Sequence, residues 1–146
     1  MADAAEFGTR WGALSEQSGD AQISGMRSIL GEVVALPDEA RGQTIEAMVK
    51  AEYALDNAAL HSFTASRLRA WLAMSSEDMD AAKKVVNGYD SSFERLPGEM
   101  AMRRATIVQT VARAEMTPEE VSGLFELIPS IVRQVPRSAP SPKYTP

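Results

Sequence analysis

Residues 79–96 carry a strict three-and-four spacing of large apolar residues, which constrains the fold more than any other feature of the sequence. The series is Met79, Ala82, Val86, Tyr89, Phe93 and Leu96. Steps of three and four keep one stripe on one face of an α-helix of about five turns. A stripe of under three heptads is short for a coiled-coil seam, so the pattern favours a core helix over a dimer seam. Both alternatives stay open. We expect the chain to pack around this helix, with Ser75 or Ser76 as its N-cap.

Similar patterns predict further helices, while apolar residues alternate nowhere over a useful length and therefore predict no strand. Besides 79–96, the predicted helices cover 20–35, 37–55, 58–74, 97–115 and 118–127. One helix over 37–74 is an alternative, because no glycine or proline interrupts it after Gly42. The clearest local signal is Thr117 followed by Pro118 and Glu120, which predicts a capping box at the start of the last helix.

The sequence thus predicts an all-α fold, a single-domain antiparallel helical bundle of five or six helices with short loops. We expect residues 20–135 to form this domain. Residues 1–19 mix glycine and serine with a few apolar residues, which predicts a flexible N-terminal arm that Trp11 could attach to the domain. Prolines recur through residues 136–146, which predicts a Pro-rich flexible tail.

Composition argues against most catalytic and metal chemistry. The chain has no cysteine and one histidine, His61, which excludes disulfides, thiolate ligands and multi-histidine metal sites. The sequence contains no glycine-rich phosphate loop, and it has no carboxylate or histidine pairs spaced as in a metal hydrolase. We therefore expect no catalytic residue, no metal and no cofactor, and the sequence does not support an enzyme.

Charge and hydropathy restrict the partners. A net charge of -5 disfavours nucleic acid, since non-specific affinity comes mostly from neutralising phosphates. No run of about 18 apolar residues exists to span a membrane. The N-terminus lacks the basic-then-apolar pattern of a signal peptide, so a cytoplasmic location is the expectation.

Three charged residues interrupt the apolar stripes and form the core of the candidate site: Glu52, Arg67 and Arg104. Burying them without partners would cost several kcal/mol. Their signs allow a carboxylate–guanidinium cluster, for which the planar arginine fork is suited. Two alternatives stay open. The stripes can reach the surface there, with arginine stems covering apolar neighbours, or the charges can form a ligand site.

Two further residues complete this candidate set. His61 lies at the edge of the stripe on the 58–74 helix, which favours a boundary histidine over a pH sensor or proton acceptor. Trp71 lies in the same stripe as Arg67, and a dry cavity near it would indicate an apolar ligand held between helices.

Residues Thr110–Phe125 resemble the helix-turn-helix pattern of bacterial regulators, with alanine in the first helix, an apolar–hydroxyl pair in the turn and valine in the second helix. The resemblance implies a DNA-binding regulator. The segment departs from the pattern at Glu115, where glycine is usual. It departs again at Glu119 and Glu120, whose carboxylates would face phosphates and acceptor-rich base edges. DNA binding is therefore an alternative and not the main expectation.

The function expected from the sequence is a small cytoplasmic helical module for protein–protein interaction or regulation, without catalytic activity. The partner would be another protein or a second copy in a homodimer. Its surface is expected on the 79–96 helix or on the 58–74 helix. The alternatives are the helix-turn-helix regulator over Thr110–Phe125 and a bundle that binds a small apolar ligand.

Overall fold

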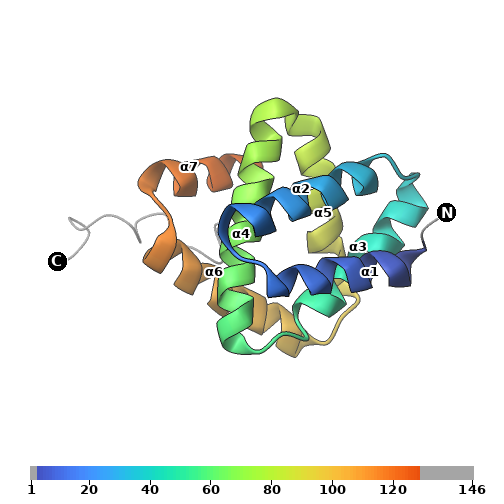
Figure 1. The fold of residues 1–146 in the computed structure, drawn as a ribbon, viewed down its shortest axis with the longest axis horizontal. Helices are drawn as coiled ribbons and strands as arrows, with labels where there is room; N and C mark the ends of the chain where they lie inside the picture. The colour runs from blue at the N-terminus through green and yellow to red at the C-terminus, as the bar shows by residue number, and fades with distance from the viewer. Residues whose placement is uncertain (1–2, 129–146) are drawn as a thin grey trace.

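The computed structural model describes residues 3–128, and in that range the chain folds into seven α-helices and no strand (Figure 1). The helices are α1 Ala4–Ala13, α2 Gly19–Val34, α3 Asp38–Glu52, α4 Asn57–Glu77, α5 Met79–Glu94, α6 Gly98–Glu115 and α7 Pro118–Leu127, with a short 3-10 helix, η1 Leu14–Glu16, after α1. The all-α prediction is confirmed, and the predicted count of five or six helices is wrong.

The chain packs around α5, which contacts α2, α3, α4, α6 and α7, and around its neighbour α4. Helix α4 contacts α2, α5, α6 and α7, and it runs through the middle of the molecule in Figure 1. Every residue from Phe63 to Leu68 is buried, because neighbours cover α4 on all sides. Such a helix loses the contrast between an apolar and a polar face on which periodicity depends. Helix α5 keeps that contrast: its stripe is buried from Ala82 to Phe93, while Met79 is exposed.

The helices do not share one axis as in an antiparallel bundle. Figure 1 shows α1 and α2 crossing α4 and α5 steeply. Helices α1 and α3 even run in the same direction, since Gly8 lies against Ala47 and Gly12 lies against Ala51. A Cβ atom built on Gly8 would lie only 3.0 Å from the carbonyl oxygen of Ala47. The two helices can therefore approach closely only because that position has no side chain.

The prediction of a flexible arm over residues 1–19 is wrong for the described part of that segment. Helix α1 begins at Ala4, where the Asp3 carboxylate accepts from the backbone N–H of Glu6 at 2.9 Å. Trp11 is fully buried and Phe7 is 3% exposed, so α1 belongs to the core. Gly8 and Gly12 lower helix propensity, so the sequence did not predict this helix, but the missing side chain at Gly8 is what allows α1 to pack closely on α3.

The ends of other helices confirm some caps and correct one. Helices α3 and α4 are separate, and Asp56 caps α4 through the N–H of Ala59 at 2.8 Å. The capping box of Thr117 and Glu120 forms as predicted. The serine cap predicted for α5 is wrong. Ser75 and Ser76 donate back to carbonyl groups of α4, and Asp78 caps α5.

The remaining sequence predictions concern membrane spans and the C-terminal tail. Within residues 3–128, no helix is both long enough and apolar enough to cross a membrane. The predicted end of the domain at residue 135 and the predicted tail over 136–146 lie outside the described residues.

Candidate functional site

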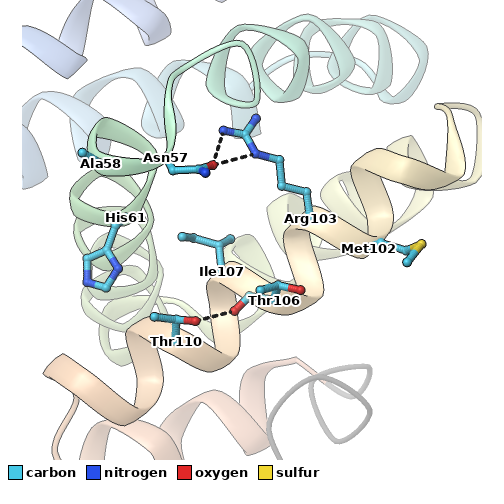
Figure 2. Close-up of a pocket in the computed structure, with 8 residues that line it drawn as sticks. All are labelled: Asn57, Ala58, His61, Met102, Arg103, Thr106, Ile107 and Thr110. Carbon is cyan, nitrogen blue, oxygen red and sulfur yellow. Dashed lines mark hydrogen bonds between the residues drawn. The ribbon is translucent and has the colours of Figure 1, made fainter.

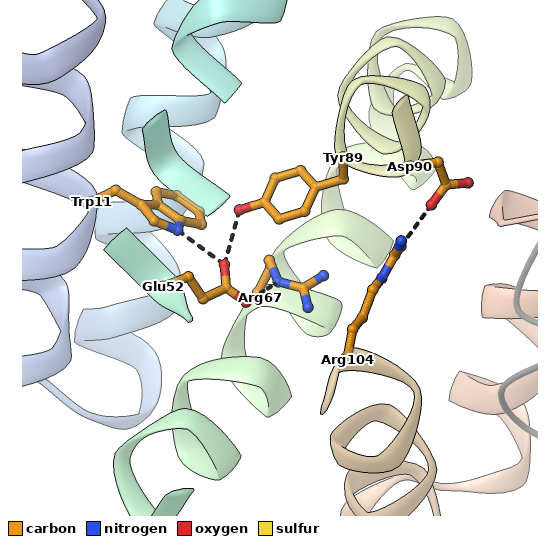
Figure 3. A network of polar contacts seen from close by, with 6 residues as sticks. All are labelled: Trp11, Glu52, Arg67, Tyr89, Asp90 and Arg104. Carbon is orange, nitrogen blue, oxygen red and sulfur yellow. Dashed lines mark hydrogen bonds and ion pairs between the residues drawn. The ribbon is translucent and has the colours of Figure 1, made fainter. Parts of the chain in front are cut away.

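A buried carboxylate, Glu52 at the end of α3, lies at the centre of the molecule's polar core. Its exposed fraction is 0%, and its two oxygens accept from three helices (Figure 3). The Trp11 Nε1–H and the Tyr89 hydroxyl donate to Oε1 at 3.1 and 2.9 Å. The Arg67 Nε–H donates to Oε2 at 2.7 Å. This set of donors replaces the hydration that the carboxylate loses on burial.

Arg67 on α4 is the matching cation and is 1% exposed. Its guanidinium carbon lies 4.5 Å from the Trp71 ring centroid and 4.9 Å from that of Tyr89, within cation–π range. Burial alone lowers the pKa of Arg67. The charge of Glu52 and its hydrogen bond with Arg67 more than reverse that effect, so the pKa stays above its usual value. The guanidinium therefore carries its charge throughout the range in which proteins fold.

Both tyrosines beside this pair stay neutral. Burial raises the pKa of Tyr53 to about 12 and raises that of Tyr89 well above its usual value. Tyr89 also packs edge-on against Trp71 with 4.9 Å between ring centroids. The network thus joins α1, α3, α4 and α5 through hydrogen bonds and ring contacts in which every side chain is almost completely buried.

The structure divides the predicted charge cluster. Glu52 and Arg67 form a buried ion pair, which was one of three alternatives from the sequence. Arg104 does not join them. It pairs with Asp90 of α5 at 2.6 Å (Figure 3). Its guanidinium carbon lies 4.6 Å from the Phe93 ring centroid. With both oxygens of Glu52 engaged and the pair enclosed, this network holds helices together and presents no group to a substrate.

His61 lies apart from that network, at the rim formed by α4 and the end of α6. Its Nε2 contacts the Glu115 carboxylate, and its side chain is 26% exposed. The neighbouring Arg69 donates to the Glu115 carbonyl oxygen at 2.6 Å and to the Glu120 carboxylate at 3.0 Å. These contacts fasten the turn between α6 and α7 onto α4. His61 is thus a histidine at the boundary of the core, as the sequence favoured.

An open groove of about 760 Å³ lies between the first turns of α4 and the outer face of α6 (Figure 2). It is mostly apolar, although several of its residues are polar. The residues that line it are Asn57, Ala58, His61, Met102, Arg103, Thr106, Ile107 and Thr110. Met102 is 73% exposed, and Met79, at 37%, is the other large apolar side chain that is exposed in the described range.

The charged group in the groove wall is already engaged. The Arg103 guanidinium donates to the carbonyl oxygens of Tyr53 and Leu55, each at 2.6 Å, and to Asn57 Oδ1 at 3.0 Å. Arg103 therefore fixes the α3–α4 loop against α6. Further along the same wall, the Thr110 hydroxyl donates to the Thr106 carbonyl oxygen at 2.9 Å, which satisfies the hydroxyl within its own helix.

Sequence reasoning missed Met102 and Arg103. The apolar residues of 97–115 that share one helix face are Met100, Ile107, Val108 and Val111, which leaves Met102 on the outer face. A large apolar residue at such a position was the available signal. No sequence signal marks Arg103, because its partners are backbone carbonyl groups of a distant loop.

The segment that resembles a helix-turn-helix, Thr110–Phe125, covers the end of α6 and most of α7. The second helix is buried through Val121, Leu124 and Leu127. Its exposed residues are Pro118, Glu119, Ser122 and Glu126. Its solvent face thus offers two acids and no base to a phosphate backbone.

Comparisons with protein-family models, with curated proteins and with solved structures give no match to this chain. Within residues 3–128, no three histidine or acidic side chains are grouped to hold a metal ion.

Proposed function

We propose that this chain is a helical interaction module that binds a helix of a protein partner in the groove between α4 and α6, without catalysing a reaction. The observation that carries the proposal is the exposure of Met102 beside an open, mostly apolar groove. A large apolar side chain exposed at the edge of an apolar groove is a candidate contact for a protein partner.

The chemistry of the groove supports a protein ligand. Methionine is flexible and adapts to differently shaped apolar partners. The groove wall is held by Arg103 on one side and by the His61–Glu115 contact on the other, so it is formed before binding. Helix-in-groove recognition uses apolar anchors from one face of an amphipathic helix, which an open apolar groove can accept. The cytoplasmic location and the regulatory role expected from the sequence stay predictions.

The experiment described below also distinguishes two other possible ligands from a protein partner. A small apolar molecule is the second candidate, because the groove volume falls in the range of about 300–1,000 Å³ usual for such sites. DNA is disfavoured by the acidic solvent face of α7, where Glu119 and Glu126 lie.

A photo-crosslinker at a single cysteine tests the proposal, since the chain has no other cysteine. Ala58→Cys places the probe in the groove, and Ala21→Cys is a matched control at another exposed position in the first turn of a helix. We expect Ala58→Cys, and not Ala21→Cys, to give one protein adduct that mass spectrometry identifies, with the crosslinked residue in a helix-forming segment.

Met102→Asp combined with Ala58→Cys should remove the adduct without lowering the melting temperature, because Met102 is 73% exposed. Equal adducts from Ala58→Cys and Ala21→Cys would contradict the proposal. Capture of a small apolar compound alone, or of DNA alone, would replace it with one of the other two functions.

A further inference from the structure

The outer face of α6 carries a stripe of exposed residues on the side opposite its buried residues. The stripe consists of Glu99, Met102, Thr106, Thr110 and Arg113, all of which are exposed. At 100° per residue they fall within roughly 80° of the helix circumference. The buried residues of α6, Arg104, Val108, Val111 and Ala112, lie on the other side. The stripe therefore forms one continuous surface along one edge of the groove.

The ends of this stripe carry opposite charges. Glu99 lies in the first turn of α6 and Arg113 lies in the last turn. Neither has an ion-pair partner within residues 3–128. Between them, Thr106 and Thr110 are small, and the Thr110 hydroxyl is turned to the Thr106 carbonyl group. The middle of the stripe is thus narrow and weakly polar, with Met102 as its large apolar residue.

The stripe is complementary to a second copy of itself that runs in the opposite direction. Glu99 and Arg113 stand equally far from Thr106 in the sequence, seven residues on either side, and Met102 and Thr110 stand four residues on either side. A two-fold axis through Thr106 would thus place Glu99 beside Arg113 of a second copy and Met102 beside Thr110 of that copy. In a two-fold interface every such contact occurs twice. Parallel pairing would instead bring Glu99 against Glu99 and Arg113 against Arg113.

We propose that the partner of the α6 face is a second copy of this chain, with two α6 helices packed antiparallel about Thr106. The inference rests on the proposed function and names the partner of the groove edge where Met102, Thr106 and Thr110 lie. The threonines let the helices approach, and the two methionines fill the space on either side of the axis. The charged ends select the antiparallel orientation and contribute little affinity, because exposed ion pairs are weak. The resulting contact is small, so the dimer is transient and depends on concentration.

Sedimentation velocity of the full chain over a range of concentrations measures this association. We expect a monomer–dimer equilibrium. Arg113→Glu turns both end pairs into like charges and should raise the dimer dissociation constant roughly tenfold. Glu99→Arg should do the same. The double reversal, Glu99→Arg with Arg113→Glu, restores opposite charges and should return the constant to within about threefold of the original.

Two controls keep the result specific. Lys83→Glu on α5 changes the net charge as Arg113→Glu does, and it should leave the dimer unchanged, because Lys83 is exposed on another helix. Thr106→Arg places two cations at the axis and should abolish the dimer. The melting temperature of each variant shows whether it is folded, because reversed charges at helix ends oppose the helix dipole.

A chain that stays monomeric at every concentration overturns the inference, as does a dimer that the double reversal fails to restore. The proposed function has a separate outcome. If the crosslinker at Ala58→Cys captures a different protein while sedimentation shows only monomer, the interaction module stands and the second copy does not. An adduct to residues 129–146 of the same chain overturns both.

Discussion

Breaking the Glu52–Arg67 pair should cost more stability than any exposed ion pair of the same length. The two side chains are 0% and 1% exposed, so removing one partner leaves a charge in a site without water. Arg67→Met leaves the Glu52 carboxylate with the neutral donors Trp11 and Tyr89 alone. Glu52→Gln leaves the guanidinium with ring contacts and a neutral amide. Each change should lower the free energy of unfolding by about 3–5 kcal/mol.

The double variant distinguishes a coupled pair from two independent losses. With both charges gone, neither is stranded, so Glu52→Gln with Arg67→Met should cost at least about 2 kcal/mol less than the sum of the single changes. Urea unfolding followed by circular dichroism and by tryptophan fluorescence measures the three values. If a single variant is too unstable in buffer, all proteins can be compared in trimethylamine oxide, which favours the compact state.

The pair formed by Arg95 and Glu46 is the matched control. It has the same 2.7 Å distance from Nε to a carboxylate oxygen, but its side chains are 51% and 27% exposed. The same substitutions there should show a coupling below about 1 kcal/mol. Single changes at Glu52 and Arg67 that are additive and each below about 1 kcal/mol would refute the reasoning, since burial would then not control the cost.

Three further predictions concern the core, α1 and the α6–α7 turn. Phe93→Ala should lower the free energy of unfolding by about 3–5 kcal/mol, because the ring is 8% exposed and packs edge-on against Tyr53; a loss below about 1 kcal/mol in urea unfolding contradicts this. Gly8→Ala should lower the free energy of unfolding by about 1–3 kcal/mol, because the new Cβ would lie 3.0 Å from the Ala47 carbonyl oxygen. Gly31→Ala, whose new Cβ has nothing within 4 Å, should raise the free energy of unfolding by up to about 1 kcal/mol. Equal effects of the two substitutions would show that α1 and α3 are not in close contact. Burial raises the pKa of Glu120, but the hydrogen bonds from Arg69 and Thr117 outweigh it and leave the pKa below its ordinary 4.5. The stabilisation from Glu120 is therefore complete above pH 4.5 and is lost as the pH falls through the lower folded value, so Glu120→Gln should flatten that part of a curve of melting temperature against pH.

Local signals in the sequence were sufficient for the ends of most helices and insufficient for their arrangement. The capping box at Thr117 was predictable because all its atoms come from four consecutive residues. The role of α4 was not, because a helix covered on all sides shows no clear stripe. Helix α1 was missed because Gly8 and Gly12 look like breaks until Ala47 and Ala51 are known to lie opposite them.

The same distinction applies to the candidate site. Glu52 and Arg67 were identifiable as charges within apolar stripes, since burial of either requires a partner. Their pairing depends on how α3 and α4 pack, as does the separate pairing of Arg104 with Asp90. The Arg103 contacts with the α3–α4 loop are long-range and involve backbone acceptors, which leave no trace in the sequence of that loop.

The side chains that hold this fold together are distinct from those of the proposed binding surface. The polar core around Glu52 joins four helices and is closed to solvent, whereas the α6 stripe has its side chains in solvent and joins no two of the helices described. Arg103 connects the two regions by fixing the α3–α4 loop that follows Glu52 to the groove wall. Substitutions at Met102 or Thr106 can therefore remove a partner without lowering the melting temperature. Substitutions at Arg103 should affect both, because the groove loses its wall when the loop is released.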